Sequence, residues 1–256
     1  MKIELNYNVP EPERTSPELI SYLDVSYQYI KDLYDQSNIN RKYNDFLKGK
    51  SVVIVGPASY LEGKSLGVFF DEFDVVVRLN RSFPISNPTD YGNKCDIRYH
   101  NMSQHPAQGG PLMIDLMLES DVKYVSSPFP KHLDYFHHDI SKCEAELQGS
   151  GVDFHSWADL EEFLTFHMLL NTRPNIGTCA ILDLLNYDIK RLHISGITFF
   201  QDGYNSDYMD RDDDLVPAYH SNGVANHAQK PQKQLIKLIV ENDSRITLDD
   251  EVRESL

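Results

Sequence analysis

Residues Ser51 to Arg98 read SVVIVGPASYLEGKSLGVFFDEFDVVVRLNRSFPISNPTDYGNKCDIR. An apolar run predicts a buried strand, and a turn of glycine, proline and serine follows it. A short helix comes next, and a second apolar strand ends at Arg78-Leu79-Asn80. A strand, a tight turn, a helix and a second strand in close succession are typical of a crossover unit in a parallel sheet. Because such sheets bind nucleotides at their carboxyl edge, the polar turn is a candidate ligand site.

Gly56 and the later Gly63-Lys64-Ser65 look like the two ends of a phosphate-binding loop. Six residues separate them, two more than that motif allows. The additional residues include Glu62, whose carboxylate would repel a bound phosphate. The sequence Gly56-Pro57-Ala58 also lacks the Gly-x-Gly of a dinucleotide site. The spacing therefore disfavours a phosphate-binding loop, and the missing glycine disfavours a dinucleotide site.

The order of parts in this stretch matches a known family motif. The matching residues are Val53-Ile54-Val55-Gly56, Leu61, Leu66-Gly67, Asp71, Asp74, Val75 to Asn80, Asp90 to Lys94, and Arg98. Together they resemble the large sialyl motif of the animal-type sialyltransferases, glycosyltransferase family 29. The resemblance implies that the cytidine nucleotide of a donor contacts Asn80 and the turn of Gly56, Pro57, Ala58 and Ser59. Pro57 stands where the family usually has asparagine, so one donor hydrogen bond is expected to be missing or moved.

A second candidate site begins at Arg173-Pro174-Asn175-Ile176-Gly177-Thr178, ahead of a helical run from Cys179 to Asn186. Proline, a polar residue and glycine at a helix start leave backbone N–H groups free, and these groups with the helix dipole form an anion site. An ordinary helix cap explains the segment equally well by itself. The segment resembles the small sialyl motif, which implies donor contacts from Asn175, Ile176, Gly177 and Thr178. Because Ile176 has no side-chain donor, any contact there must come from the backbone.

Two segments that each contain a histidine resemble the third and the last sialyl motifs of the family. The histidines are His220, within Tyr219 to Asn222, and His227, which is followed five positions later by Gln232 where the family has an acid. A neutral imidazole can accept a proton near physiological pH because histidine ordinarily titrates at about pH 6.5. The resemblance implies that His227 is the general base and that His220 hydrogen-bonds the departing phosphate. The chain has ten histidines, so an ordinary structural role is the alternative for each.

The loop from Gly203 to Val216 is polar and rich in turns. Its acidic run, Asp210 to Asp214, satisfies the Asp-x-Asp pattern that holds a divalent ion on a diphosphate in many sugar transferases. A solvated surface loop is the plainer interpretation of such a run. Because the family resemblance implies a monophosphate donor, we expect no metal and interpret the loop as a lid. Tyr204 and Tyr208 are candidates for stacking on an acceptor sugar.

Composition limits the other classes of function. The net charge of −15 argues against nucleic acids and anionic membranes as partners. The amino-terminal residues contain no long apolar run, so we expect no signal peptide and no transmembrane segment. Three cysteines cannot all pair, which favours a reducing compartment. These features predict a cytoplasmic protein, and the alternative is a family member from which an amino-terminal anchor has been removed.

Periodicity predicts the remaining elements. A helix is expected after Ser16-Pro17, where apolar residues follow helical spacing as far as Leu33. Alternating strands and helices are expected beyond the large motif. The predicted strands are residues 96–100, 123–126, 192–196 and 245–248, and the predicted helices are residues 112–119, 131–147, 158–169 and 232–240.

These features predict an α/β fold, with one Rossmann-like domain, a mainly parallel sheet and helices on both faces. Residues 1–47 are expected to be a helical extension packed on the core, and residues 48–256 a nucleotide-sugar-binding glycosyltransferase domain. The expected function is inverting transfer of sialic acid, or a related 2-keto acid sugar such as Kdo, from a CMP donor to a glycan hydroxyl. The CMP-sugar is then a co-substrate, and no cofactor is expected. The alternatives are a transferase of the same scaffold that uses a UDP- or GDP-sugar, and a glycan- or nucleotide-binding module without turnover.

Overall fold

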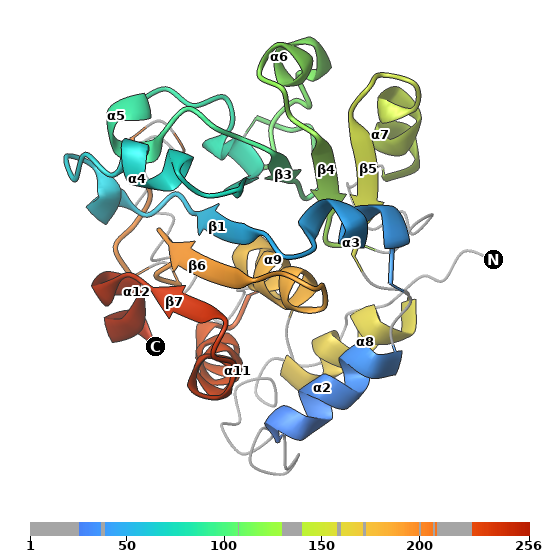
Figure 1. The fold of residues 1–256 in the computed structure, drawn as a ribbon, viewed down its shortest axis with the longest axis vertical. Helices are drawn as coiled ribbons and strands as arrows, with labels where there is room; N and C mark the ends of the chain where they lie inside the picture. The colour runs from blue at the N-terminus through green and yellow to red at the C-terminus, as the bar shows by residue number, and fades with distance from the viewer. Residues whose placement is uncertain are drawn as a thin grey trace.

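The structure is a computed structural model, and the part of the chain that it describes comprises residues 26–36, 39–106, 108–129, 140–157, 160–170, 173–199, 201–206, 208 and 227–256. Within these residues, one parallel sheet crosses the molecule, and helices pack on it from both sides (Figure 1).

The sheet has seven strands in the order β5-β4-β3-β2-β1-β6-β7, and every neighbouring pair is parallel. The strands are β1 (Ser51–Val55), β2 (Val75–Leu79), β3 (Ile97–Tyr99), β4 (Tyr124–Ser127), β5 (Asp153–Ser156), β6 (Arg191–Ser195) and β7 (Ile246–Leu248). From β1 the chain proceeds outward on one side as far as β5, and then returns to place β6 on the other side of β1. The order of strands therefore reverses between β1 and β6, and such a switch point is where open parallel sheets bind ligands.

Helices connect most of these strands. They are α2 (Tyr27–Gln36), α3 (Arg41–Leu47), α4 (Gly67–Asp71), α5 (Pro88–Tyr91), α6 (Ile114–Glu119), α7 (Ile140–Leu147), α8 (Leu160–Leu170), α9 (Ile176–Leu185), α11 (Gln229–Asn242) and α12 (Asp250–Ser255). Two short 3₁₀ helices, η2 (Ser59–Leu61) and η3 (Asn80–Ser82), directly follow the ends of β1 and β2. Helices α2 and α8 each pack against α11 (Figure 1).

Alternate residues of β1 face two separate cores, because successive side chains of a strand point to opposite faces. Val52 and Ile54 belong to a core that includes α3, α9 and α11. Val53 and Val55 belong to a second core with η2, α4 and α5. A further core packs α6 and α7 against Val125 of β4. The prediction of helices on both faces of a mainly parallel sheet is confirmed.

Most predicted elements are present with small shifts of their ends. The helix expected after Ser16-Pro17 is described only from Tyr27, and residues 131–139 of another predicted helix also lie outside the described residues. The helix expected over 232–240 is longer and covers 229–242. Strand β5 and helices α3, α5 and α12 were not predicted.

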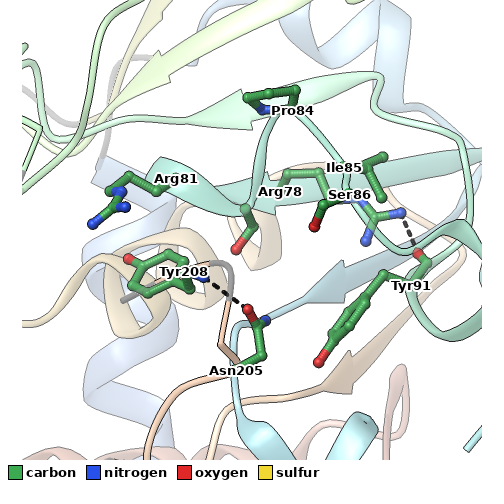
Figure 2. A pocket seen from close by; sticks show the side chains of 9 residues that line it. Arg78, Arg81, Pro84, Ile85, Ser86, Tyr91, Asn205 and Tyr208 are labelled. Atoms are coloured by element: carbon green, nitrogen blue, oxygen red, sulfur yellow. Dashed lines mark hydrogen bonds between the residues drawn. The ribbon is translucent and has the colours of Figure 1, made fainter. Parts of the chain in front are cut away.

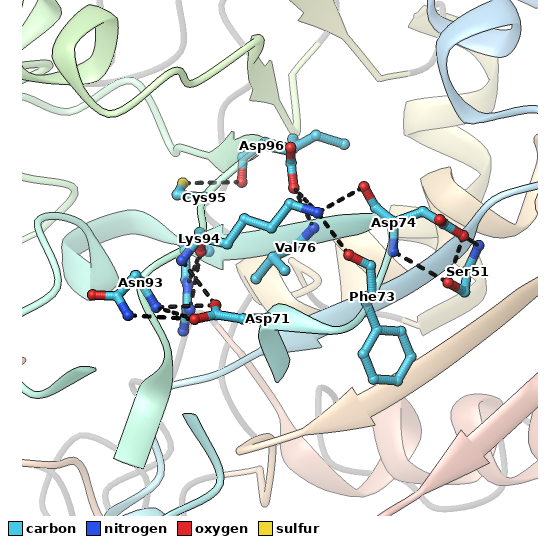
Figure 3. A network of polar contacts seen from close by, with 11 residues as sticks. Ser51, Asp71, Phe73, Asp74, Val76, Asn93, Lys94, Cys95 and Asp96 are labelled. Atoms are coloured by element: carbon cyan, nitrogen blue, oxygen red, sulfur yellow. Dashed lines mark hydrogen bonds and ion pairs between the residues drawn. The ribbon is translucent and has the colours of Figure 1, made fainter. Parts of the chain in front are cut away.

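Acidic residues of the large motif fix the starts of the strands at the amino edge of the sheet (Figure 3). Asp74 accepts hydrogen bonds from the Ser51 N–H at 2.8 Å and from the Ser51 hydroxyl at 2.6 Å. The Ser51 hydroxyl bond is the main reason why the pKa of Asp74 lies below its usual value. Asp71 accepts from the backbone N–H groups of Asn93 and Lys94, each at 2.9 Å. These motif residues are therefore structural and lie away from the candidate ligand edge.

Helix α9 is fixed to the sheet by a buried carboxylate, Asp183. The hydroxyl of Tyr99 on β3 donates to it, and His155 Nε2 on β5 lies 3.1 Å from both of its oxygens. His155 Nδ1 accepts from the Asn40 side chain at 3.3 Å, so Nε2 carries the proton and donates. Because Tyr99, His155 and Asp183 are fully buried, the network fixes the position of α9 and thereby of its amino terminus.

Candidate functional site

The candidate site lies at the carboxyl ends of β1, β2 and β6. Gly56 follows β1, Gly196 follows β6, and the two glycine backbones are in close contact. A Cβ on Gly56 would lie 2.2 Å from the Gly196 carbonyl oxygen, and a Cβ on Gly196 would lie 2.4 Å from that of Gly56. Only glycine fits at either position, so the switch point of the sheet depends on this pair.

The turn after β1 is hydrogen-bonded to the loop after β6. The N–H of Gly56 donates to Ser195 O at 2.8 Å, and that of Ala58 donates to Gly196 O at 3.1 Å. The N–H of Ser59 donates to Gly203 O at 3.3 Å, while Pro57 has no N–H. The backbone donors of the predicted donor-binding turn are therefore occupied within the protein. A nucleotide could contact this turn only through other groups.

Asn80 begins η3 in a left-handed conformation with φ of 47° and is nearly buried. Its Oδ1 accepts from the Asn101 N–H at 2.9 Å, and its carbonyl accepts from Arg98 Nε at 3.0 Å. Burial raises the pKa of the Tyr208 hydroxyl, and a hydrogen bond from the Asn80 side chain opposes that rise. Asn80 thus connects η3 to the segment that follows β3 and to Tyr208.

The amino terminus of α9 is capped by two amide side chains. Asn175 is the N-cap, and its Oδ1 accepts from the Thr178 N–H at 2.8 Å. Gln232 on α11 is fully buried, and its Oε1 accepts from the Asn175 N–H and from the Thr178 hydroxyl, both at 2.8 Å. Gln232 Nε2 donates to Ala228 O at 2.8 Å. The glutamine that stands at the family's acidic position therefore joins the start of α11 to the start of α9.

This capping leaves the N–H groups of Ile176 and Gly177 in the first turn of α9 with no hydrogen-bond partner among the described residues. The helix dipole adds partial positive charge at the same point. Two adjacent N–H groups at a helix start suit an anion such as a phosphate. The sequence prediction of a backbone contact at Ile176 fits this geometry.

His227 lies just before α11 and is bonded to the segment that precedes α9. Its Nδ1 is 2.8 Å from Arg173 O, and because a carbonyl only accepts, Nδ1 carries the proton. Its Nε2 therefore has the lone pair and accepts from Arg173 Nη2 at 3.1 Å. Arg173 also acts on His167: burial lowers the pKa of His167 to about 4, and the Arg173 charge contributes to this. His227 is thus oriented as a neutral imidazole, the form that a general base requires.

The segment that looked like a phosphate loop already contains an anion of the protein itself. Asp90 accepts from the N–H groups of Gly63 at 2.7 Å and Ser65 at 2.8 Å. The Gly63 bond, followed by the Ser65 bond, lowers the pKa of Asp90 below its usual value. Lys64 forms an ion pair with Glu251 at 3.0 Å. This turn is therefore structural, as the spacing indicated.

A pocket opens beside η3, next to Asn80 (Figure 2). Arg81 and the residues that follow it line one part of this pocket, and Asn205 and Tyr208 line another. The ring centroids of Tyr204 and Tyr208 are 4.8 Å apart. Tyr204 forms a backbone β-bridge with Ala58 of the donor turn, and the ring of Tyr208 lies against that of Tyr204. Their role as acceptor residues stays a prediction.

Two candidate features, His220 and the acidic run Asp210 to Asp214, lie outside the described residues. In the part of the chain that is described, no group of three or more histidine, cysteine, aspartate or glutamate side chains could hold a metal ion. All three cysteines are free thiols and are buried. None of the described helices is both long enough and apolar enough to span a membrane.

A comparison with protein families identifies the chain. Residues 6–164 match the model of glycosyltransferase family 29 (sialyltransferase). The chain belongs to this family. It is therefore a glycosyltransferase, and the large-motif resemblance is confirmed. The matched range ends before Arg173, so the segments that resemble the small, third and last motifs lie beyond it.

Solved sialyltransferases share the fold of this family member. CstII from Campylobacter jejuni, in complex with the substrate analogue CMP-3FNeuAc, is 17% identical with a TM-score of 0.52, and the match covers 79% of this chain and 88% of that chain. Cst-I from Campylobacter jejuni, a monofunctional α-2,3-sialyltransferase, is 14% identical with a TM-score of 0.53 over 79% and 77% of the two chains. A mammalian sialyltransferase is 12% identical with a TM-score of 0.52 over 90% and 82%. No curated protein sequence gives a match.

Sequence reasoning missed two residues of the candidate site in this family-29 chain. Arg173 stands at the start of the segment that resembles the small motif, and only its contact with His227 reveals a role. Arg81 directly follows the Arg-Leu-Asn run, and its placement in a pocket could not be read from that position. The one sequence signal for Arg81 and Arg173 is that each is a positively charged residue close in sequence to a predicted ligand residue.

Proposed function

We propose that this chain transfers sialic acid, or a related 2-keto acid sugar, from a CMP donor to a glycan hydroxyl with inversion at the anomeric carbon. The observation that carries the proposal is the hydrogen bond from His227 Nδ1 to Arg173 O. It fixes the neutral tautomer, in which the basic nitrogen, Nε2, holds the lone pair that accepts from Arg173 Nη2. The nearby start of α9 supplies a place for the phosphate of the donor.

In this reaction the acceptor hydroxyl replaces Arg173 as the donor to His227 Nε2. The imidazole takes the hydroxyl proton, and the oxygen forms a bond to the anomeric carbon on the face opposite the phosphate. The bond between that carbon and the phosphate oxygen breaks, and its electron pair leaves with CMP. Because the new bond forms opposite the old one, the configuration inverts.

The departing CMP gains negative charge on its phosphate. The N–H groups of Ile176 and Gly177 and the dipole of α9 stabilise this charge without any change in their position. His220 is proposed to donate a further hydrogen bond. A single phosphate held in this way needs no divalent ion, so we propose a reaction without metal.

The test replaces the proposed base, His227, and the control replaces a second histidine in the same way. His227→Ala should lower turnover at least about a hundredfold, the usual effect of losing a general base, while CMP binds as in the wild type. Turnover is measured as CMP released from CMP-sialic acid with a glycan acceptor, and binding by calorimetry. The control is His105→Ala, which removes an exposed histidine and should change neither quantity.

A His227→Ala variant with an unchanged rate would remove His227 from the mechanism. If the wild type releases nucleotide only from UDP- or GDP-sugars, the scaffold serves another donor. If it binds nucleotide sugars but turns over none of them, the binding-module alternative is correct.

A further inference from the structure

Two arginines, Arg78 and Arg81, line the pocket beside η3. Arg78 is fully buried and donates to the backbone carbonyls of Tyr91 and Lys94. Arg81 lies in the first turn after Asn80 and lines the same pocket (Figure 2). Over the described ranges, neither arginine forms an ion pair. The pocket is therefore lined by two arginines that have no salt-bridge partner among the described residues, in a chain whose net charge is −15.

The Arg81 head group has no hydrogen-bond acceptor among the residues that the structure describes. The Ser82 hydroxyl lines the same pocket, is buried, and also has no partner within the described part of the chain. Buried polar groups in native proteins are almost always paired. A guanidinium and a hydroxyl that both lack an acceptor fit an anionic ligand with several oxygens, such as a carboxylate or a phosphate.

The pocket adjoins the donor site without sharing its lining. None of the residues assigned to the donor, from Gly56 to Ser59, Asn80 and Asn175 to Thr178, lines it. Two contacts place it next to that site: the Asn205 N–H donates to Pro57 O at 2.8 Å, and Tyr208 is hydrogen-bonded to the Asn80 side chain. A group bound here would lie beside the donor, where the second substrate must approach the donor sugar.

We propose that this pocket is an acceptor subsite for an anionic substituent, either the carboxylate of an acidic sugar or a phosphate, and that Arg81 contacts this substituent directly. The proposal rests on the proposed function, because it assumes that a glycan acceptor binds beside a nucleotide donor. It narrows the acceptor class from any glycan to glycans that already carry a negative charge.

The experiment compares three saccharides by calorimetry in the presence of saturating CMP. The probes are lactose, lactose that carries a terminal sialic acid, and lactose that carries a phosphate on galactose. The wild type should bind at least one acidic probe about tenfold more tightly than lactose, because a charge-assisted hydrogen bond has about this effect on affinity. The acidic probe with the larger gain identifies the source of the anion. Added salt should reduce the preference.

Arg81→Gln should abolish the preference, and Arg81→Lys should retain part of it because the charge remains. The control is Arg191→Gln, which removes the same charge from an exposed position where β6 begins, at the amino edge of the sheet, and should leave the preference as in the wild type.

Equal affinity of the wild type for all three probes, or a preference that persists in Arg81→Gln, would overturn the proposal. A loss of CMP affinity in Arg81→Gln with the saccharide preference intact would also overturn it, since Arg81 would then belong to the donor site. If the wild type transfers sugar from no CMP donor, the proposed function is wrong. The affinities for the three saccharides still decide whether the pocket binds an anionic substituent.

Discussion

Gln232 shows how one amide can replace a carboxylate without leaving a buried charge. Its oxygen accepts from two groups at the start of α9, and its Nε2 donates to Ala228 O. A carboxylate could make the first two contacts, but it has no proton to donate to the carbonyl. The neutral side chain satisfies all three contacts in a fully buried position. The departure from the family pattern therefore has a structural reason in this chain.

Gln232→Leu should destabilise the protein by at least about 2 kcal/mol, because it leaves the Asn175 N–H and the Thr178 hydroxyl buried without an acceptor. Gln234→Leu makes the same chemical change at an exposed position of α11 and should alter the free energy of unfolding by no more than about 0.5 kcal/mol. Urea unfolding followed by circular dichroism measures both. Equal stability of the two variants would show that the α9 contacts of Gln232 contribute nothing.

At the scale of elements, α4 and α5 meet through a glycine. A Cβ on Gly67 would lie 2.0 Å from Pro88 O and 2.7 Å from Thr89 O. These obstacles are backbone atoms, which cannot rotate away as a side chain does. The two short helices lie between β1, β2 and β3 in the chain, so their contact fixes the layer that covers the second core.

Gly67→Ala should therefore destabilise the protein by about 2 to 4 kcal/mol, because the helices must separate to admit the methyl group. At this chain length the melting midpoint should fall by roughly 5 to 15 °C. Val68→Ala on the same helix removes an exposed side chain and should change the midpoint by no more than about 2 °C. Differential scanning calorimetry of the two variants checks the prediction, and a Gly67→Ala midpoint within 2 °C of wild type would contradict it.

The sequence allowed prediction of elements whose pattern is locally strong. The strands of the large motif are continuous apolar runs, as buried parallel strands require, and β1 and β2 appear where expected. Strand β5 reads Asp153-Phe154-His155-Ser156, and as an edge strand it is only partly buried, so its pattern is weak. Helix α12 is mostly charged and depends on packing of Val252 rather than on periodicity. Such elements are set by tertiary contacts that no local pattern contains.

The candidate site likewise has features that the local sequence predicts and features that depend on tertiary contacts. The helix start at Gly177 and the turn at Gly56 follow from residue type and order, so they could be predicted. The contact of Arg173 with His227 joins residues 54 positions apart, and it exists only because α9 and α11 pack together. The occupied N–H groups of the turn after β1 likewise depend on the distant loop after β6.

At the scale of the whole molecule, a strongly acidic protein must bind an anionic nucleotide through local groups. The net charge of −15 opposes the approach of a phosphate, but screening limits this repulsion to about 8 Å at physiological salt. The N–H groups at the start of α9 act within that distance. Affinity for the donor should therefore depend on the base and the single phosphate rather than on overall charge.

Saturating CMP should raise the melting midpoint by about 5 to 10 °C, because a ligand at a hundred times its dissociation constant stabilises the native state by about 2.7 kcal/mol. UMP, GMP and AMP should each give a much smaller shift. The CMP shift should be the same in excess EDTA, since the proposed phosphate site uses backbone N–H groups without a metal. Thermal scans with each nucleotide test this. A larger shift with a uridine or guanosine nucleotide would contradict the CMP-sugar assignment.

The contact between the ends of β1 and β6 also bears on the order in which the protein folds. The Ser59 hydroxyl donates to a carbonyl 143 residues later, and the Gly196 N–H donates to a tyrosine hydroxyl 136 residues earlier. Closing such long loops costs entropy before any contact compensates for it, which makes these pairings slow. The turn after β1 therefore acquires its final shape only after most of the chain has left the ribosome. Until then, β1 has an unpaired edge, and unpaired strand edges promote aggregation during synthesis.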